Sequence, residues 1–275
     1  MIYNDEYANI DDNLTDSNVG ARKDRNIRDN IFVLNAISNS VIKGKEDDID
    51  IQVFDIEKCF DALWAHECIN DIYDAGLNND NLPLLFLESR NGKCAVKVND
   101  VKTKRVDIDN IIMQGTVWGS LFCTATMDKL AKLIYNNQEL VYKYKGVVDT
   151  PCLGMVDDIL SVQKCSSQSV KTNAAINAFV ELKKLKFSED KCHRIHIGKH
   201  PKDQSMCPTL KVHEEEMKSS QKEKYLRNMI TNKGTIKATI EERKAKGYAA
   251  VAEIIAILKD IPLGEHKLEI GLQLR

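Results

Sequence analysis

Three aspartates have the type and setting for metal-dependent chemistry. Asp157 and Asp158 interrupt the apolar run at 152–162, and Asp55 ends the apolar segment at 49–56. Ionised carboxylates in apolar surroundings are costly unless cations or hydrogen bonds compensate them. Mg²⁺ prefers such oxygen ligands, and two ions about 4 Å apart can support transfer of a phosphoryl group. The alternative for the adjacent pair is an acidic hairpin tip that points into water.

The elements around these residues determine whether the carboxylates can meet. Alternating apolar residues predict a strand at 49–56, and helical spacing predicts a helix at 58–76 that ends near Gly76. Adjacent side chains on a strand point to opposite faces, so Asp157 and Asp158 can face one point only in a hairpin turn. We expect Asp55 on a neighbouring strand, with the three carboxylates within roughly 6 Å of one another.

The remaining patterns predict a mixture of helices and strands. Apolar periodicity predicts helices at 25–42, 82–87, 118–140 and 167–185, the last with Asn173 on its polar side. Segments 93–98 and 104–108 have the alternation of paired strands. No Gly/Ser linker or repeat divides the chain. We therefore expect one continuous α+β domain with a looser C-terminal appendage.

Composition and charge narrow the class of protein. The chain has 275 residues, of which 43% are hydrophobic and 29% charged, and no apolar stretch approaches the roughly 20 residues that span a bilayer. Residues 183–275 contain 20 Lys and Arg against 13 Asp and Glu. This excess predicts a polyanionic partner or simply solvated helical faces. Eight cysteines without Cys-x-x-Cys favour reduced thiols inside the cell, in the nucleus or cytoplasm.

Four segments, in order, resemble the palm motifs of reverse transcriptases, in particular those of non-LTR (LINE-type) retrotransposons. They are VFDIEKCFD at 53–61, MQGTVWGSLF at 113–122, MVDDI at 155–159 and LKFSEDKCHRIHIG at 185–198. Segment 18–29 resembles the basic finger segment of the family, and 224–254 resembles its primer-grip hairpin and first thumb helix. The resemblance implies an α+β polymerase palm, with an antiparallel sheet backed by helices, at 49–230. It implies partial fingers at 1–48 and the start of a helical thumb at 231–275.

The same resemblance implies an RNA-directed DNA polymerase that uses Mg²⁺ or Mn²⁺, an RNA template, a DNA primer and deoxynucleoside triphosphates. No membrane partner is expected, because no apolar stretch is long enough to span a bilayer. Asp55, Asp157 and Asp158 correspond to the catalytic, metal-binding aspartates. The other implied positions are the carbonyl of Ile56 at a metal, Phe60 under the incoming sugar, Gln114 and Gly115 near nucleotide or template, Lys191 near the triphosphate, and Arg22, Lys23, Arg25 and Arg28 on nucleic-acid phosphates. The alternatives are a core residue for Phe60, a turn for Gln114 and Gly115, a surface lysine for Lys191 and an exposed basic helix start for the last four.

Some residues depart from the family pattern. Arg227 follows Tyr225 and Leu226 where the family's primer-grip turn has glycine. The short segments before the basic residues and after the thumb helix predict a fragment that lacks much of the fingers and thumb and an endonuclease domain. One alternative function is therefore a catalytically inactive remnant that binds nucleic acid, and a weaker one is a metal phosphatase. A loosely spaced zinc set is a further, minor possibility, formed by Cys192, His196, His200 and Cys207.

Overall fold

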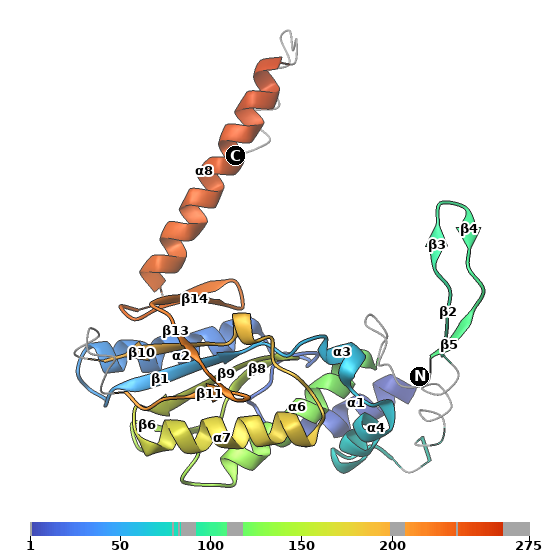
Figure 1. Cartoon of the computed structure of the whole chain (residues 1–275), viewed down its shortest axis with the longest axis horizontal. Helices are drawn as coiled ribbons and strands as arrows, with labels where there is room; N and C mark the ends of the chain where they lie inside the picture. The colour runs from blue at the N-terminus through green and yellow to red at the C-terminus, as the bar shows by residue number, and fades with distance from the viewer. Residues whose placement is uncertain are drawn as a thin grey trace.

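A five-stranded sheet forms the centre of the molecule. The computed structural model describes residues 2–78, 80, 81, 83, 92–108, 118–198, 207–234 and 236–260. The strands lie in the order β13-β10-β1-β9-β8. β1 (Ile49–Phe54) is antiparallel to both β9 (Asp158–Lys164) and β10 (His193–Ile197). β8 (Leu153–Met155) forms a hairpin with β9, and β13 (Lys218–Ser219) runs parallel to β10 (Figure 1).

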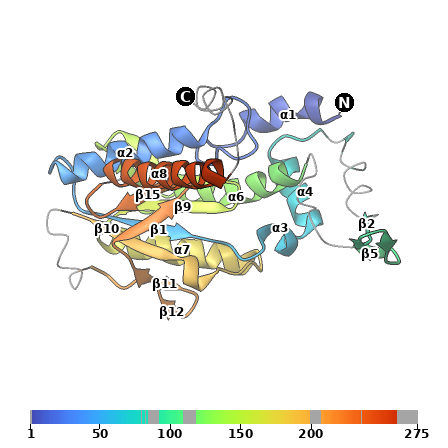
Figure 2. The same ribbon diagram turned by 90° about the horizontal axis from the view of Figure 1, so that it is seen from above.

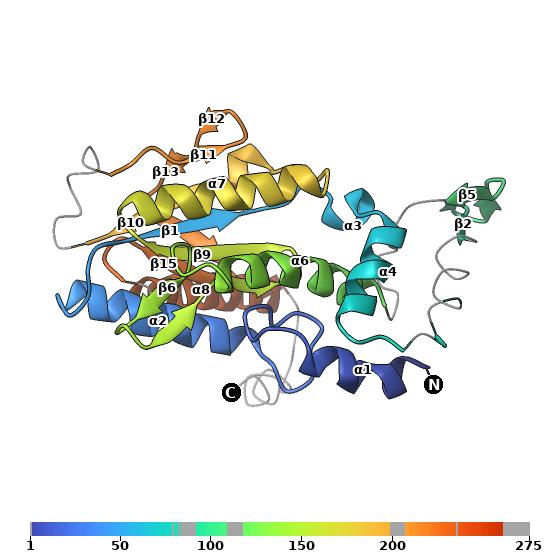
Figure 3. The same cartoon turned by 90° about the horizontal axis from the view of Figure 1, so that it is seen from below.

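Helices cover both faces of this sheet. α2 (Ile27–Ile42) lies on one face and α7 (Ser167–Leu182) on the other, as two further views show (Figures 2 and 3). α6 (Gly119–Tyr135) packs against α7 and against α4 (Ala65–Asp74). Because side chains alternate along a strand, Ile49 and Ile51 of β1 join the core beneath α2. The predicted helices at 25–42, 118–140 and 167–185 are confirmed, although the second and third end earlier than predicted.

The face of β1 beneath α7 is polar and yet buried. Asp50 and Gln52 are both 0% exposed. Gln52 donates through Nε2 to the Ser169 carbonyl at 3.2 Å and accepts from Asn173 Nδ2 at 3.1 Å. Asn173 accepts a further hydrogen bond from the Lys211 N–H at 2.9 Å. Asn173 thus lies among polar groups, as predicted, but this polar side of the helix is buried, and the hydrogen bonds offset the cost of burying it.

The helix predicted at 58–76 is interrupted. α3 (Cys59–Ala62) is a single turn, and α4 begins only after two residues with extended backbone. Gly76 follows α4 with φ +103°. Glycine adopts this left-handed conformation at lower cost than other residues, so it ends the helix where predicted. The break between the two helices was not predicted.

Short hairpins and one long helix surround the sheet. Residues 93–98 and 104–108 were predicted to pair, and this is confirmed in part. β2 (Gly92–Cys94) pairs with β5 (Val106–Ile108), while β3 (Lys97–Val98) and β4 (Val101–Lys102) extend the same hairpin. The helix predicted at 82–87 lies, except for residue 83, outside the described residues. α8 (Ile236–Asp260) contacts β15 and projects away from the sheet (Figure 1). None of the helices in the described part of the chain has the length and apolarity needed to cross a bilayer.

The remaining elements are α1 (Ile2–Asp12), β6 (Tyr142–Tyr144), β7 (Val148–Thr150), η1 (Glu189–Lys191), β11 (Lys211–Val212), β12 (Glu215–Glu216), β14 (Lys222–Tyr225) and β15 (Asn228–Thr231).

Truncation of α2 at its buried face should destabilise the fold. Ile37 is 0% exposed in the core between α2 and the sheet. We expect Ile37→Ala to lower the free energy of unfolding by about 2–5 kcal/mol, through lost burial and the cavity left behind. Urea unfolding measures this change. Phe32 lies on the same helix and is 73% exposed, so Phe32→Ala should change stability by no more than about 0.5 kcal/mol; equal losses in both variants would contradict the packing.

Candidate active site

The Asp55 carboxylate lies directly after β1. The Asp55 N–H donates to the sulfur of Cys192 at 3.4 Å, and its carbonyl accepts from the Ser188 N–H at 2.9 Å. The side chain is 30% exposed, and Lys191 Nζ lies 3.1 Å from its Oδ2. The end of the central strand therefore presents an anchored carboxylate, paired with one ammonium group, to solvent.

The adjacent aspartates occupy the hairpin between β8 and β9. Met155 pairs with Asp158, so Val156 and Asp157 are the two turn residues. The predicted hairpin is confirmed, with its turn one residue earlier than predicted because Asp158 already belongs to β9. Asn18 supports the turn: its Oδ1 accepts from the Val156 N–H and its Nδ2 donates to the Val156 carbonyl, both at 3.0 Å.

The strand register brings Asp55 toward this hairpin. Phe54 of β1 pairs with Ile159 of β9. Because the two strands are antiparallel, the next positions along the same register are Asp55 and Asp158. A one-residue slip would send the side chains to the opposite face, so this pairing determines whether the carboxylates meet.

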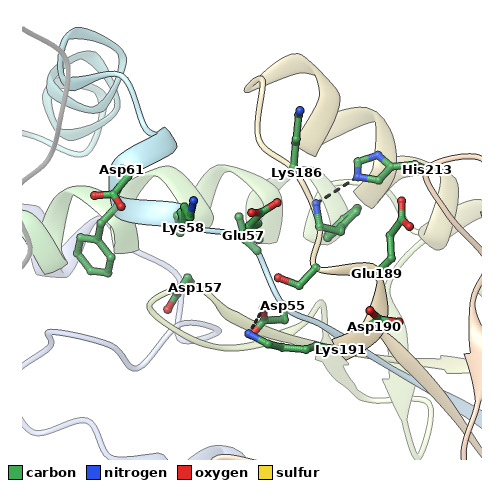
Figure 4. A pocket seen from close by; sticks show the side chains of 15 residues that line it. Asp55, Glu57, Lys58, Asp61, Asp157, Lys186, Glu189, Asp190, Lys191 and His213 are labelled. Atoms are coloured by element: carbon green, nitrogen blue, oxygen red, sulfur yellow. Dashed lines mark hydrogen bonds and ion pairs between the residues drawn. The ribbon is translucent and has the colours of Figure 1, made fainter.

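Two cavities border the Asp55 carboxylate. One, of about 1130 Å³, is lined by Asp55, Asp157 and Lys191 (Figure 4). The other, of about 590 Å³, is lined by Asp55 and Asp158. The end of β1, the hairpin turn and η1 thus contribute charged groups to one concave region. Asp55 and Asp157 line the larger cavity, and Asp55 and Asp158 line the smaller one.

The pKa values of the paired aspartates are raised. Burial is the main cause at both positions, and the charge of Asp55 adds to it. The further charge of Asp157 helps to raise the pKa of Asp158 to about 6. Lys191 acts in the opposite direction, and its own pKa is raised by its hydrogen bond to Asp55. The concave region therefore has more negative charge than Lys191 neutralises.

The donor chemistry of the three aspartates fits a divalent cation. Carboxylate oxygens with uncompensated charge are the ligands that Mg²⁺ and Mn²⁺ prefer. Without a bound cation, the negative charges of the three carboxylates repel one another. Among the described residues, the compact group of potential ligand atoms, all within 4.8 Å of one another, lies elsewhere, around Asp50. The aspartates thus offer a suitable donor set in a more open arrangement.

The chain matches a known protein family over most of its length. The family described as "Reverse transcriptase (RNA-dependent DNA polymerase)" matches residues 3–230. The chain belongs to the reverse transcriptase family. The matched region extends from α1 to β15 and contains the three aspartates.

Solved telomerase structures have a similar fold. Apo telomerase from Candida tropicalis, truncated from its C-terminal domain, has a TM-score of 0.57 and 15% identity, covering 84% of this chain and 43% of that chain. Apo telomerase from the same organism has a TM-score of 0.56 and 14% identity, covering 84% and 39%. C. tropicalis telomerase in complex with the TWJ fragment of telomeric RNA has a TM-score of 0.53 and 14% identity, covering 78% and 33%. The chain thus spans less than half the length of these structures, and the likeness confirms the predicted α+β fold with antiparallel sheets. No curated protein matches the sequence.

Two further positions of this reverse transcriptase domain line the larger cavity. Ile56 forms an isolated bridge with Phe187, and its side chain is buried. Phe60 lies in α3, is half-buried and packs partly against the core. Both residues also border the cavity beside Asp55. Phe60 thus packs partly against the core, as one interpretation predicted, and its place under an incoming sugar stays a prediction.

Arg22 does not fit the phosphate contact predicted for it. Its side chain is 2% exposed, and Nε lies 2.5 Å from Asp11 Oδ1. The guanidinium also donates to the carbonyls of Asp11, Thr15 and Asn18. This arginine instead ties α1 to the following loop, because its donors are already bound within the protein.

The other basic residues of this region remain accessible. Lys23, Arg25 and Arg28 are exposed, although Arg25 forms an ion pair with Asp16. Lys23 and Arg25 line a third cavity together with Met155 of the hairpin strand. Lys23 and Arg25 therefore lie near the aspartate hairpin.

The β14–β15 hairpin forms despite the missing glycine. Leu226 and Arg227 are its turn residues, with φ of 47° and 62°. Positive φ at both positions matches a type I′ turn. Tyr225 donates through its hydroxyl to the Leu153 carbonyl at 2.7 Å. The hairpin is thereby attached to β8, and its turn residues line the smaller cavity with Asp55 and Asp158.

Some predicted residues lie outside the described part of the chain or belong to another site. Gln114, Gly115 and His200 are outside the described residues. The zinc set predicted with Cys192 is wrong, because this thiol contacts the backbone of Asp55. His196 and Cys207 do meet, with Nδ1 3.4 Å from Sγ.

Sequence reasoning missed several residues of the cavity. Lys186 and His213 line it (Figure 4), and His213 Nε2 accepts from the Phe187 N–H at 3.2 Å. Lys186 lies within the recognised segment 185–198 and could have been found there. His213 has no local signal, because it comes from the loop between β11 and β12.

Removal of the Asp158 charge should stabilise the fold at neutral pH. Its folded-state pKa of about 6 lies above the ordinary value of 3.8, so wild-type stability is full below about pH 4 and falls as pH rises toward 6. Although burial of the carboxylate raises its pKa, the residue as a whole is exposed and water partly screens its charge, so we expect Asp158→Asn to gain about 1 kcal/mol at pH 7 and nothing at pH 4. Urea unfolding at both pH values measures the gain.

The control for this prediction is Asp47→Asn, which removes a carboxylate exposed at the other end of the sheet. It should produce no pH-dependent gain. A gain of Asp158→Asn that is equal at pH 4 and pH 7 would show that the charge is not the cause.

Proposed function

We propose that this chain is the polymerase part of a non-LTR (LINE-type) retrotransposon reverse transcriptase, which adds deoxynucleotides to a DNA primer 3′-OH on an RNA template. The observation that carries this proposal is that Asp55 lies next to the Asp157–Asp158 hairpin in the strand register and lines one open cavity with Asp157. Residues 1–48 are assigned to partial fingers, 49–230 to the palm and 231–275 to the start of the thumb. The order of the four recognised segments supports the LINE-type assignment.

In this proposal Asp55, Asp157 and Asp158 hold Mg²⁺ or Mn²⁺, with the Ile56 carbonyl as a further ligand. When bound, the ions lower the pKa of the attacking hydroxyl and neutralise the leaving pyrophosphate. The aspartates themselves must be ionised to bind cations. Because the pKa of Asp158 is about 6, protonation competes with metal binding below that pH.

Lys191 is positioned to offset charge on the triphosphate. Its ion pair with Asp55 is at the surface, where such pairs contribute little. A triphosphate carries more negative charge than one carboxylate and can draw the ammonium away from Asp55. The proton stays on Nζ throughout, so Lys191 acts as a cation near the leaving group rather than as a base.

Exposed cations provide the contacts to nucleic acid. Lys23, Arg25 and Arg28 bind phosphates without reading sequence. The RNA fragment in the solved C. tropicalis telomerase complex supports RNA as a ligand class for this fold. Seven of the eight cysteines, those whose side chains the structure describes, are free thiols, and we propose an intracellular location, in the nucleus or cytoplasm.

Primer extension tests the assignment directly. The purified chain should extend a DNA primer on an RNA template only with Mg²⁺ or Mn²⁺. Asp157→Asn should lower the rate roughly 10²- to 10³-fold, as expected for removing one electrostatic group from an active site. Asp47→Asn, a control outside the cavities, should extend normally. Template binding without extension by the wild type would instead identify an inactive nucleic-acid-binding remnant.

Phe60 should determine discrimination against ribonucleotides. Its ring would lie under the incoming sugar, where it excludes a 2′-OH by bulk. We expect Phe60→Ala to raise kcat/KM for a ribonucleotide relative to its deoxynucleotide roughly 10- to 100-fold. Single-nucleotide incorporation kinetics measure the ratio, with Phe60→Tyr as the control that keeps the bulk. An unchanged ratio in Phe60→Ala would remove this role.

A further inference from the structure

A second cluster of ligand-type side chains lies away from the aspartate hairpin. Asp50, Cys165, His196 and Cys207 each offer one ligand atom, and these atoms all lie within 4.8 Å of one another. Asp50 is 0% and His196 6% exposed, and the two cysteines are partly exposed. This mixture of thiol, imidazole and carboxylate is a donor set that suits Zn²⁺ better than Mg²⁺.

The sheet itself brings these residues together. Asp50 of β1 and His196 of β10 are directly opposite in the antiparallel register. Cys165 follows the last residue of β9, and its N–H donates to the Asp48 carbonyl at 2.9 Å. Cys207 opens the described segment 207–234. Four separate parts of the chain thus converge at one end of the sheet.

The distances are close to those of a tetrahedral zinc site. With Zn–S of about 2.3 Å and Zn–N of about 2.0–2.1 Å, a tetrahedron places two sulfurs about 3.8 Å apart and sulfur and nitrogen about 3.6 Å apart. The two cysteine sulfurs are 3.3 Å apart. His196 Nδ1 lies 3.4 Å from the Cys207 sulfur and 3.2 Å from Asp50 Oδ1. Shifts of about half an ångström would accommodate the ion.

The surrounding groups complete the site. His196 Nε2 lies 3.7 Å from Asp48 Oδ2, and ligating histidines commonly direct their second nitrogen to a carboxylate. Arg194 donates to Asp50 Oδ1 at 2.6 and 2.9 Å, whereas Asp50 Oδ2 is buried with no hydrogen-bond partner in the described structure. Two thiolates and one carboxylate would balance the charges of Zn²⁺ and Arg194, so the occupied site would be neutral.

This cluster is separate from the proposed catalytic site. Asp50 precedes Asp55 by five residues on the same extended strand, which corresponds to roughly 16 Å. The catalytic proposal uses none of its four residues. A role for the cluster therefore stands or falls independently of polymerase activity.

We propose that Asp50, Cys165, His196 and Cys207 bind one structural Zn²⁺ ion. The ion would join β1 and β10 to the β9–α7 connection and to the chain that leads into β11. Four protein ligands leave no open position for substrate, which is the arrangement of structural zinc sites. Its effect is on folding, because the unfolded chain does not hold these ligands together.

Metal analysis of the full chain tests the proposal. The wild type, purified under reducing conditions from zinc-containing medium, should contain one zinc per chain. Cys165→Ser and Cys207→Ser should each retain at least tenfold less. Cys68→Ser removes a buried thiol outside the cluster and should keep its zinc. Wild-type protein without zinc, or full zinc in both cluster variants, would overturn the proposal.

A second measurement on the wild type covers the case in which the variants do not fold. Co²⁺ exchanged for zinc should show the charge-transfer absorption of cobalt–thiolate bonds, which cobalt bound only at the aspartates cannot produce. Absence of this absorption would overturn the site. Peptide mapping without reductant that finds a Cys165–Cys207 disulfide in zinc-free protein would also overturn it, in favour of a redox pair. Each readout is independent of primer extension.

Discussion

The antiparallel register between β1 and β9 is the constraint on which the proposed chemistry depends. It sets Asp55, just beyond β1, opposite the first residue of β9, next to the hairpin turn. Burial of the paired carboxylates, together with the repulsion between the three negative charges, opposes folding, as the raised pKa of Asp158 indicates. Asn18 holds the turn in place with two hydrogen bonds. Packing and hydrogen bonds elsewhere must therefore offset a local repulsion that cations would relieve.

The buried layer beneath α7 is part of what resists that repulsion. Gln52 and Asn173 form hydrogen bonds that connect β1 to α7 and α7 to β11. Near the start of β1, Asp50 forms a buried ion pair with Arg194. Buried polar and charged side chains are costly when they lack partners. These contacts therefore favour the one arrangement of β1, β10 and α7 in which the partners meet. The opposite face of β1 is apolar and packs under α2. The central strand thus has two different partners, and its orientation is defined by both.

Local sequence was sufficient to predict the main elements and the aspartate hairpin. Apolar periodicity located α2, α6 and α7, and the alternation of strand side chains required the turn at Asp157. It was not sufficient for features that depend on tertiary contacts. Asn173 was placed on the polar side of its helix, but its burial was not predicted, because its partner Gln52 is distant in sequence. Arg22 was grouped with exposed basic residues, although Asp11 and nearby carbonyls bind its guanidinium. The actual partners of His196 and Cys207 come from β1 and from the end of β9, which sequence spacing does not reveal.

The most direct test of the central claim is affinity cleavage by a redox-active ion at the aspartates. Fe²⁺ replacing Mg²⁺ generates hydroxyl radicals with peroxide and ascorbate, and these cut backbone close to the bound metal. We expect cuts near Asp55 and near Asp157 in the same sample, both suppressed by excess Mg²⁺. Cleavage at only one of these segments, or at neither, would contradict the account that the strand end and the hairpin form one metal site.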